Sequence, residues 1–202
     1  MFGGTIDSAK KPGYAIATTR GYALKDKIAR NPIATAATII TCAGAATLVG
    51  AWIFQYGFGL EPCPLCLEQR IPYYIAVPLA ALIAIGAQRG FPRGALVGGL
   101  ILIALALLWG TYLGIYHSGV EWKWWAGPQD CSGAGFSAGG NLLKQIQTTR
   151  VIRCDEAAWR FLGLSLAGYN VLITLALAAV AGWAVLQSLR VEARTPRDAD
   201  GR

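Results

Sequence analysis

Residues 61–70 read EPCPLCLEQR and lie between two strongly apolar segments. The stretch contains a Cys-x-x-Cys pair, Cys63 and Cys66, with Arg70 four residues after the second cysteine. Two intervening residues let the sulfur atoms meet across one helical turn. One thiol of such a pair often has a lowered pKa, because a helix N-terminus and nearby cations stabilise the thiolate. We therefore expect this pair to be a redox-active dithiol at a membrane surface.

The composition indicates an integral membrane protein. Of the 202 residues, 54% are hydrophobic and 14% are charged, whereas a soluble domain carries roughly 25% charged residues. The net charge is +7, and the basic residues cluster at the ends of apolar segments. Lipid orientation predicts this placement, so the charge does not indicate nucleic-acid binding. The apolar segments leave no room for a large soluble domain.

Four apolar segments have about the length that a helix needs to cross the hydrocarbon core, ~20 residues. They predict an all-α integral membrane fold, a four-transmembrane-helix bundle. We expect spans at about 32–58, 72–87, 94–116 and 161–189, connecting loops at about 59–71 and 117–160, and tails at 1–31 and 190–202. The longer loop would carry a short interfacial helix within 141–147. Glycines 94, 98 and 99 would let helix backbones approach closely.

The distribution of Lys and Arg predicts the orientation of the bundle. With four spans, both termini share a side with the turn at 88–93. That side has six basic residues in the N-terminal tail, two in the turn and four in the C-terminal tail, against six on the other side. The side richer in basic residues is cytoplasmic. Both termini would then be cytoplasmic, and the loop cysteines would face an oxidising compartment.

The five cysteines fall into two groups. Cys42 lies inside the first span, where a small buried hydrophobic side chain is expected. The other four lie in the hydrophilic connections, with Cys131 and Cys154 both in the longer loop. Thiol–disulfide exchange needs access of one sulfur to another, and the glycine-rich sequence after Cys131 favours a mobile pair that exchanges with a soluble partner. A simple loop staple is the structural alternative for this pair.

Two other roles are possible for the motif, a zinc site and a structural disulfide. The four loop cysteines could bind zinc, but the second pair is far apart in sequence and the flanks are membrane-embedded, so no metal is expected. A structural disulfide is a poor use of Cys63 and Cys66, since closing a short loop constrains the unfolded chain least. Arg70 could stabilise a thiolate at Cys66 or bind the carbonyl oxygen of an acceptor. His117 ends the third span at the same surface and is either solvated or bound to that acceptor.

The motif and its position resemble a known family. Cys-Pro-Leu-Cys at 63–66 and Gln-Arg at 69–70 follow the first span, and a second cysteine pair follows the third. This arrangement resembles the bacterial disulfide bond formation protein B (DsbB) family over about residues 33–190. The loop sequences Cys-Ser-Gly at 131–133 and Arg-Cys-Asp-Glu at 153–156 are similar to one branch of that family.

The resemblance implies a membrane protein-thiol:quinone oxidoreductase of the bacterial inner membrane, with its cysteine loops in the periplasm. A reduced thioredoxin-fold oxidant of the DsbA type would attack Cys131. Cys154 would then resolve toward Cys63. Cys66, released as a thiolate, would pass the electrons to the acceptor. These four cysteines are the expected catalytic residues.

The resemblance also implies the electron acceptor, ubiquinone or menaquinone, with Arg70 and His117 as the expected quinone-binding residues. Two alternatives stay open at the level of the sequence. One is a vitamin K epoxide reductase-like quinone enzyme, although that family places its quinone-facing cysteine pair at the last span. The other is a non-catalytic membrane protein with structural disulfides. A transporter is disfavoured, because the spans contain almost no ionisable residues.

Overall fold

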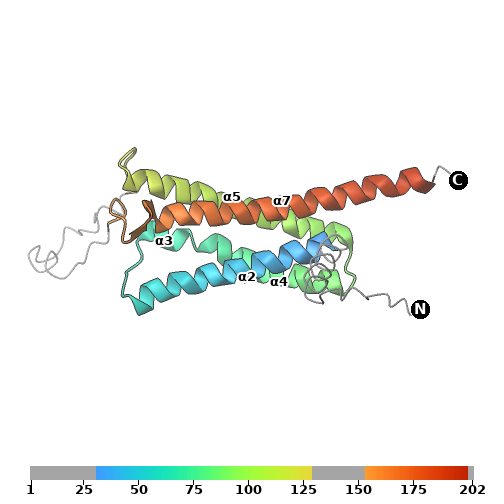
Figure 1. The fold of residues 1–202 in the computed structure, drawn as a ribbon, viewed down its shortest axis with the longest axis horizontal. Coiled ribbons are helices and arrows are strands. Elements are labelled where there is room, and N and C mark those ends of the chain that lie inside the picture. The colour runs from blue at the N-terminus through green and yellow to red at the C-terminus, as the bar shows by residue number, and fades with distance from the viewer. Residues whose placement is uncertain (1–30, 129–152, 200–202) are drawn as a thin grey trace, which may run out of the picture.

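The computed structural model describes residues 31–128 and 153–199. Within these ranges four long helices lie side by side (Figure 1). They are α2 (Pro32–Trp52), α4 (Ile71–Gln88), α5 (Arg93–Glu121) and α7 (Leu166–Ala199). Each belongs to a helical segment that is long and apolar enough to cross a membrane. The structure therefore confirms the predicted all-α membrane bundle.

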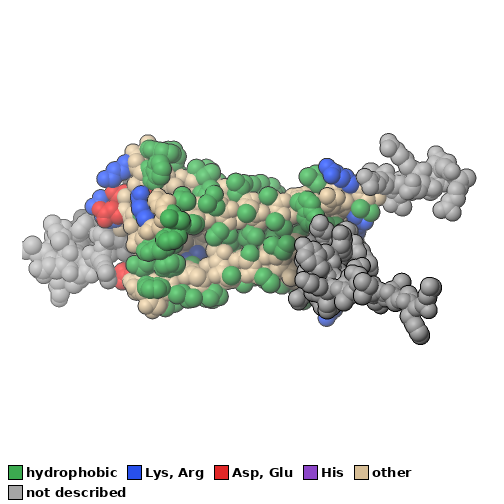
Figure 2. Space-filling view, viewed as in Figure 1, with side chains coloured by type: hydrophobic (Ala, Val, Ile, Leu, Met, Phe, Trp, Pro, Cys, Tyr) green, Lys and Arg blue, Asp and Glu red, His purple; other side chains and the backbone are tan. Residues whose placement is uncertain are grey.

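The surface of the bundle is that of a lipid-facing protein. Large apolar side chains are exposed along its length, among them Leu82, Leu102 and Leu105. Figure 2 shows apolar side chains along the bundle and most of the Lys, Arg, Asp and Glu side chains at its two ends. The start of α2, the α4–α5 turn and the end of α7 lie at one end, and the cysteine motif lies at the other (Figure 1).

Two prolines begin helices in this fold. Pro32 opens α2, and the side chain of Asn31 caps it by accepting a hydrogen bond from the backbone N–H of Ala34 (3.0 Å). Pro64 opens the short helix α3 (Pro64–Glu68), which carries the cysteine motif just before α4. Proline suits both places because its missing N–H would have no partner in the first helical turn.

The helices differ from the expected spans at three places. α2 ends at Trp52 and passes into the π-helical turn η1 (Ile53–Gly57). α5 continues to Glu121, so His117 lies within the helix. Residues 160–165, expected to begin the fourth span, form an antiparallel ribbon of β1 (Arg160–Phe161) and β2 (Leu164–Ser165).

The ribbon forms because its two turn residues, Leu162 and Gly163, both adopt positive φ angles, +49° and +82°. A two-residue hairpin turn of this kind requires positive φ at both positions. Glycine adopts it readily. The apolar content of this segment resembles a helix start, but the turn conformation delays α7 to Leu166.

Close helix contacts occur at some of the expected glycines and at others that were not expected. A methyl group on Gly99 would lie 2.8 Å from Cδ1 of Ile83, so α4 and α5 do meet there. Gly94 and Gly98 have open space beside them, and the prediction of close packing is wrong for these two. Gly114 is the contact with α7, since a methyl group there would lie 2.8 Å from a Val171 methyl.

Cys42 lies on the exposed face of α2, so the expectation of a buried side chain is wrong. Lipid is as apolar as the interior of the bundle, and hydrophobicity therefore does not distinguish the two faces of such a helix. The expected interfacial helix within 141–147 and the N-terminal tail lie outside the described residues.

Candidate functional site

The cysteine motif is held by the N-terminus of α3. Cys63 is the N-cap residue, and its sulfur accepts a hydrogen bond from the backbone N–H of Cys66 (3.3 Å). Cys66 is therefore in the first turn, where free N–H groups and the helix dipole favour negative charge. Cys63 is buried, whereas Cys66 is partly exposed.

Both cysteines of the motif are free thiols. The Cys63 thiol donates to the sulfur of Cys66 across 2.8 Å. This hydrogen bond, together with burial, raises the pKa of Cys63. In this arrangement Cys63 is the hydrogen-bond donor and Cys66 is the acceptor.

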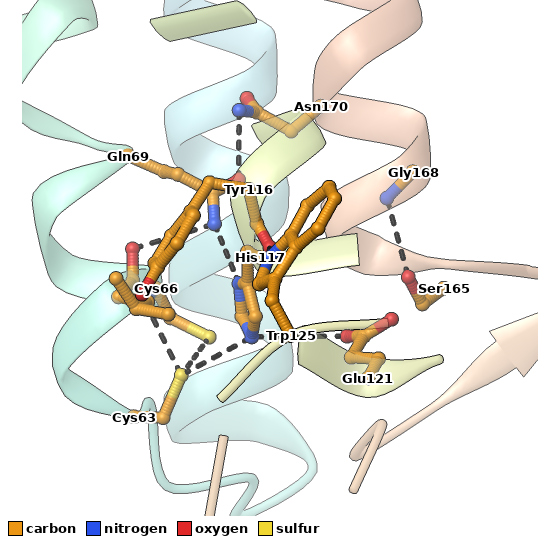
Figure 3. A network of polar contacts seen from close by, with 11 residues as sticks. Cys63, Cys66, Gln69, Tyr116, His117, Glu121, Trp125, Ser165, Gly168 and Asn170 are labelled. Carbon is orange, nitrogen blue, oxygen red and sulfur yellow. Dashed lines mark hydrogen bonds and ion pairs between the residues drawn. The ribbon is translucent and has the colours of Figure 1, made fainter. Parts of the chain in front are cut away.

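A chain of polar side chains runs from the motif into the bundle (Figure 3). Nε2 of the buried His117 lies 3.7 Å from the Cys63 sulfur, and its Nδ1 lies 2.6 Å from Nε2 of Gln69. The Gln69 carbonyl oxygen accepts from the amide of Asn170 (2.8 Å). The Asn170 oxygen in turn accepts from the hydroxyl of Tyr73 (2.8 Å). The chain thus joins α4, α5 and α7 behind the cysteines.

Arg70 approaches the site from the junction between α3 and α4. Its Nη1 donates to Oε1 of Gln55 across 2.6 Å. Gln55 belongs to the π-helical turn at the end of α2, and such turns often occur at functional sites. The hydrogen bond connects the guanidinium to the first helix and places it beside the same cavity as Cys66.

This cavity has a volume of about 450 Å³ and is bounded by α2, η1, α4 and α7 together with the segment before β1. Its walls are mostly apolar, with a few polar groups among them. The apolar lining includes Leu48, Ala51, Phe54, Trp159, Phe161, Leu166 and Ile173, and the polar lining includes Gln55, Cys66, Gln69, Arg70, His117 and Asn170. Ligand sites typically have this composition and size.

The second cysteine pair is described only in part. Cys154 is disulfide-bonded and fully buried, and it belongs to one cluster with Cys63, Leu65 and Val120. Cys131 lies outside the described residues. Of the site residues expected from the sequence, the structure thus brings together both motif cysteines, Cys154, the arginine and the histidine.

Three ligand atoms could in principle hold a metal, one each from Cys63, Cys66 and His117, all within 4.8 Å of one another. Two thiolates on one zinc ion lie about 3.8 Å apart, because each Zn–S bond is about 2.3 Å in a tetrahedral site. The 2.8 Å between the two sulfurs is too short for that arrangement. The geometry is that of a hydrogen-bonded dithiol.

Several polar residues of the site are not predicted from the sequence: Gln55, Gln69, Tyr73, Glu121 and Asn170. Gln69 lies within the cysteine–arginine motif, but the motif alone does not indicate its contact with His117. A usable signal was present for Asn170, because a buried amide within an apolar span is costly unless it is hydrogen-bonded.

Comparison with known proteins agrees with the geometry. The family model for "Disulfide bond formation protein DsbB" matches residues 33–184. A disulfide bond formation protein B from Methylococcus capsulatus is 34% identical over 138 residues, which are 67% of this chain and 83% of that protein. One from Polaromonas sp. is 27% identical over 150 residues, 70% of this chain and 84% of that protein.

A disulfide bond formation protein B from Xanthomonas campestris is 32% identical over 151 residues, covering 69% of this chain and 81% of that protein. No solved structure is significantly similar to the chain. The family match spans the cysteine motif, the cavity and nearly all of the four-helix bundle. This multi-pass membrane protein therefore belongs to the DsbB family of disulfide bond formation proteins.

Proposed function

We propose that the protein is a quinone-dependent thiol oxidase of the bacterial inner membrane. It would reoxidise a periplasmic dithiol oxidant of the DsbA type and deliver the electrons to ubiquinone or menaquinone. One observation carries the proposal. The sulfur of Cys66, hydrogen-bonded by a second thiol, lines an apolar cavity that also contains the guanidinium of Arg70.

The cavity residues fit a quinone. Its volume of about 450 Å³ and its apolar walls suit a substituted ring that comes from the lipid phase. Arg70 supplies N–H donors, which a quinone needs because its carbonyl oxygens only accept hydrogen bonds. Arg70 would hold the ring beside Cys66, with His117 in the wall of the cavity. A bound quinone supplies an acceptor for two electrons and two protons.

The chain's own groups favour thiolate formation at Cys66. The helix N-terminus and the donated hydrogen bond from Cys63 both stabilise negative charge there. Oxidation of the dithiol to a disulfide forms one S–S bond and releases two electrons and two protons. Cys63 must lose its proton for the Cys63–Cys66 disulfide to form, so its deprotonation is a required step of the oxidation.

Exchange between the two cysteine pairs is supported by the position of Cys154 near Cys63. Cys154 and Cys63 belong to the same buried cluster. We propose that a thiolate of Cys154 attacks a Cys63–Cys66 disulfide at Cys63, which forms a Cys63–Cys154 bond and releases Cys66 as a thiolate. Cys131 would be the residue that exchanges with the soluble partner. Electrons thus enter as thiols of the partner and leave from Cys66.

The test compares two cysteine variants in purified, detergent-solubilised protein. Cys66→Ser is expected to abolish quinone reduction by a reduced DsbA-type protein, because no thiolate remains beside the cavity. Cys42→Ser is the matched control, since Cys42 lies on the outer face of α2, and it should retain the wild-type rate. Thermal unfolding of both variants checks that the bundle is intact. Full turnover by a folded Cys66→Ser protein would refute the proposed function.

A further inference from the structure

We infer that a directional chain of hydrogen bonds fixes the tautomer of His117, the one histidine in the sequence. The chain consists of Tyr73, Asn170 and Gln69. It holds the imidazole with its proton on Nε2, so that the ring donates toward the sulfur of Cys63. Which groups donate and which accept follows from the contacts alone. Only the role of the hydrogen bond from His117 to Cys63 rests on the proposed function.

The backbone carbonyl of Leu65 sets the direction. It lies 3.3 Å from the side-chain nitrogen of Gln69, and a carbonyl oxygen can only accept a hydrogen bond. The amide of Gln69 must therefore present its NH₂ group on this side. The same nitrogen lies 2.6 Å from Nδ1 of His117, so Nδ1 accepts a hydrogen bond and carries no proton.

The remaining links point the same way. With its nitrogen directed at His117, Gln69 presents its oxygen to Asn170, whose amide nitrogen donates to it. The oxygen of Asn170 then faces Tyr73, whose hydroxyl donates. Rotating the Gln69 amide would place its oxygen against the carbonyl oxygen of Leu65. Rotating the Asn170 amide would place its oxygen against the Gln69 oxygen. Gln69 and Tyr73 are both buried, and buried polar groups in proteins are almost always paired. Reversal of the chain is therefore unfavourable.

The opposite side of the ring gives an independent argument for the same tautomer. Nε2 of His117 faces the Cys63 sulfur at 3.7 Å and a carboxyl oxygen of Glu121 at 3.8 Å. The Cys63 thiol donates its proton to Cys66, so its sulfur offers Nε2 an acceptor. Glu121 is buried, and its second oxygen has no hydrogen-bond partner within the described ranges. A bare Nε2 would face the lone pairs of the Cys63 sulfur, whereas an N–H can donate to them.

The tautomer decides what the histidine does in the site. A neutral imidazole protonated at Nε2 is a hydrogen-bond donor at that atom and cannot accept a proton or bind a metal there. His117 would then stabilise negative charge on the sulfur of Cys63 when that thiol is deprotonated. Gln69 and Asn170 are positioning residues, since they act on the sulfur through the orientation of the ring.

The test is the ¹⁵N spectrum of reduced protein labelled at histidine, in which a protonated and a bare ring nitrogen have well-separated shifts. Wild-type protein should show Nε2 protonated and Nδ1 bare. In Gln69→Glu the carboxylate accepts from Nδ1, because imidazole is the stronger base, and a proton should appear on Nδ1. A wild-type spectrum with Nδ1 protonated and Nε2 bare would overturn the inference.

The remote half of the chain is tested at Asn170, which does not contact the ring. Asn170→Leu removes one of the two groups that orient the Gln69 amide, and a second tautomer should appear in the spectrum. Thr111→Val is the control, because it removes a hydrogen bond between α5 and α7, from Thr111 to Thr174, the helices that also carry His117 and Asn170. In this variant His117 should keep a single tautomer. If Asn170→Leu shows only the Nε2–H tautomer, Asn170 does not help to orient His117, and the part of the inference that includes Asn170 is wrong.

These spectra need neither quinone nor a redox partner, so the two proposals can fail separately. A wild-type spectrum with Nε2–H together with an active Cys66→Ser variant would refute the oxidase and leave the tautomer established. A wild-type spectrum with Nδ1–H together with an inactive Cys66→Ser variant would refute the tautomer and leave the proposed oxidase function intact.

Discussion

At the scale of single residues, the two motif cysteines differ in environment although only two residues separate them. Cys63 is the buried donor and Cys66 the partly exposed acceptor. The hydrogen bond to Cys66 and burial both raise the pKa of the Cys63 thiol. Thiolates, not thiols, react with alkylating agents. The difference in environment therefore predicts a difference in reactivity.

In the reduced protein at neutral pH, alkylation should modify Cys66 faster than Cys63, and Cys63 should require a higher pH. Cys66→Ala removes the larger cause of the raised pKa, so the pH profile of Cys63 alkylation should move to lower pH. Site-resolved mass spectrometry across a pH series measures both rates. Cys42→Ala is the control and should leave the profile unchanged. Identical profiles for Cys63 in wild type and Cys66→Ala would show that the hydrogen bond does not protect the thiol.

Residue-level prediction from the sequence succeeds where the chemistry is local. Cys63, Cys66 and Arg70 share ten residues of sequence, and their spacing on a helix start brings them to one cavity. The pairing of Gln69 with Asn170 joins residues 101 positions apart. Such a contact depends on how the helices are arranged in the folded bundle, which no local pattern contains.

At the scale of elements, small residues determine how closely the helices pack. Gly114 on α5 has a Val171 methyl 2.8 Å and the backbone oxygen of Ala167 3.3 Å from the position of an added methyl group. Gly98, on the same helix, has open space there. The two glycines form a matched pair, because both are helical and only one is at an interface.

Gly114→Ala should destabilise the bundle by about 1–3 kcal/mol, the usual effect of overpacking, since the backbone of α7 must shift to admit the methyl group. Gly98→Ala should be neutral or slightly stabilising, because alanine is the better helix former. Reversible unfolding in detergent, followed by circular dichroism, compares the two variants. Equal stability of both variants would show that α5 and α7 are not in close contact at Gly114.

The elements themselves were predictable because a span needs a minimum length of apolar residues, whatever its neighbours. Their ends were less so. The ribbon at 160–165 depends on two positive φ angles. α5 extends to Glu121 and includes His117, the residue at which the sequence predicts the start of a loop. The lipid-facing position of Cys42 was also unpredictable, because both surroundings of α2 are apolar.

At the scale of the whole molecule, α3 with the cysteine motif lies at one end of the bundle and the α4–α5 turn at the other (Figure 1). Electron flow from periplasmic thiols to a quinone requires the cysteine end to face the periplasm. The bias of Lys and Arg toward the opposite end predicts this orientation. Lys123 and Gln88 are exposed residues at the two ends, and they provide sites for a direct measurement.

In a background with all five cysteines replaced by serine, a membrane-impermeant maleimide added to intact spheroplasts should label Lys123→Cys. It should label Gln88→Cys only after the membrane is lysed, because the α4–α5 turn would be cytoplasmic. Labelling of both variants after lysis controls for reactivity. The reverse pattern would place the dithiol in the reducing cytoplasm, where disulfides do not persist, and the bundle could then not generate disulfides for exported proteins.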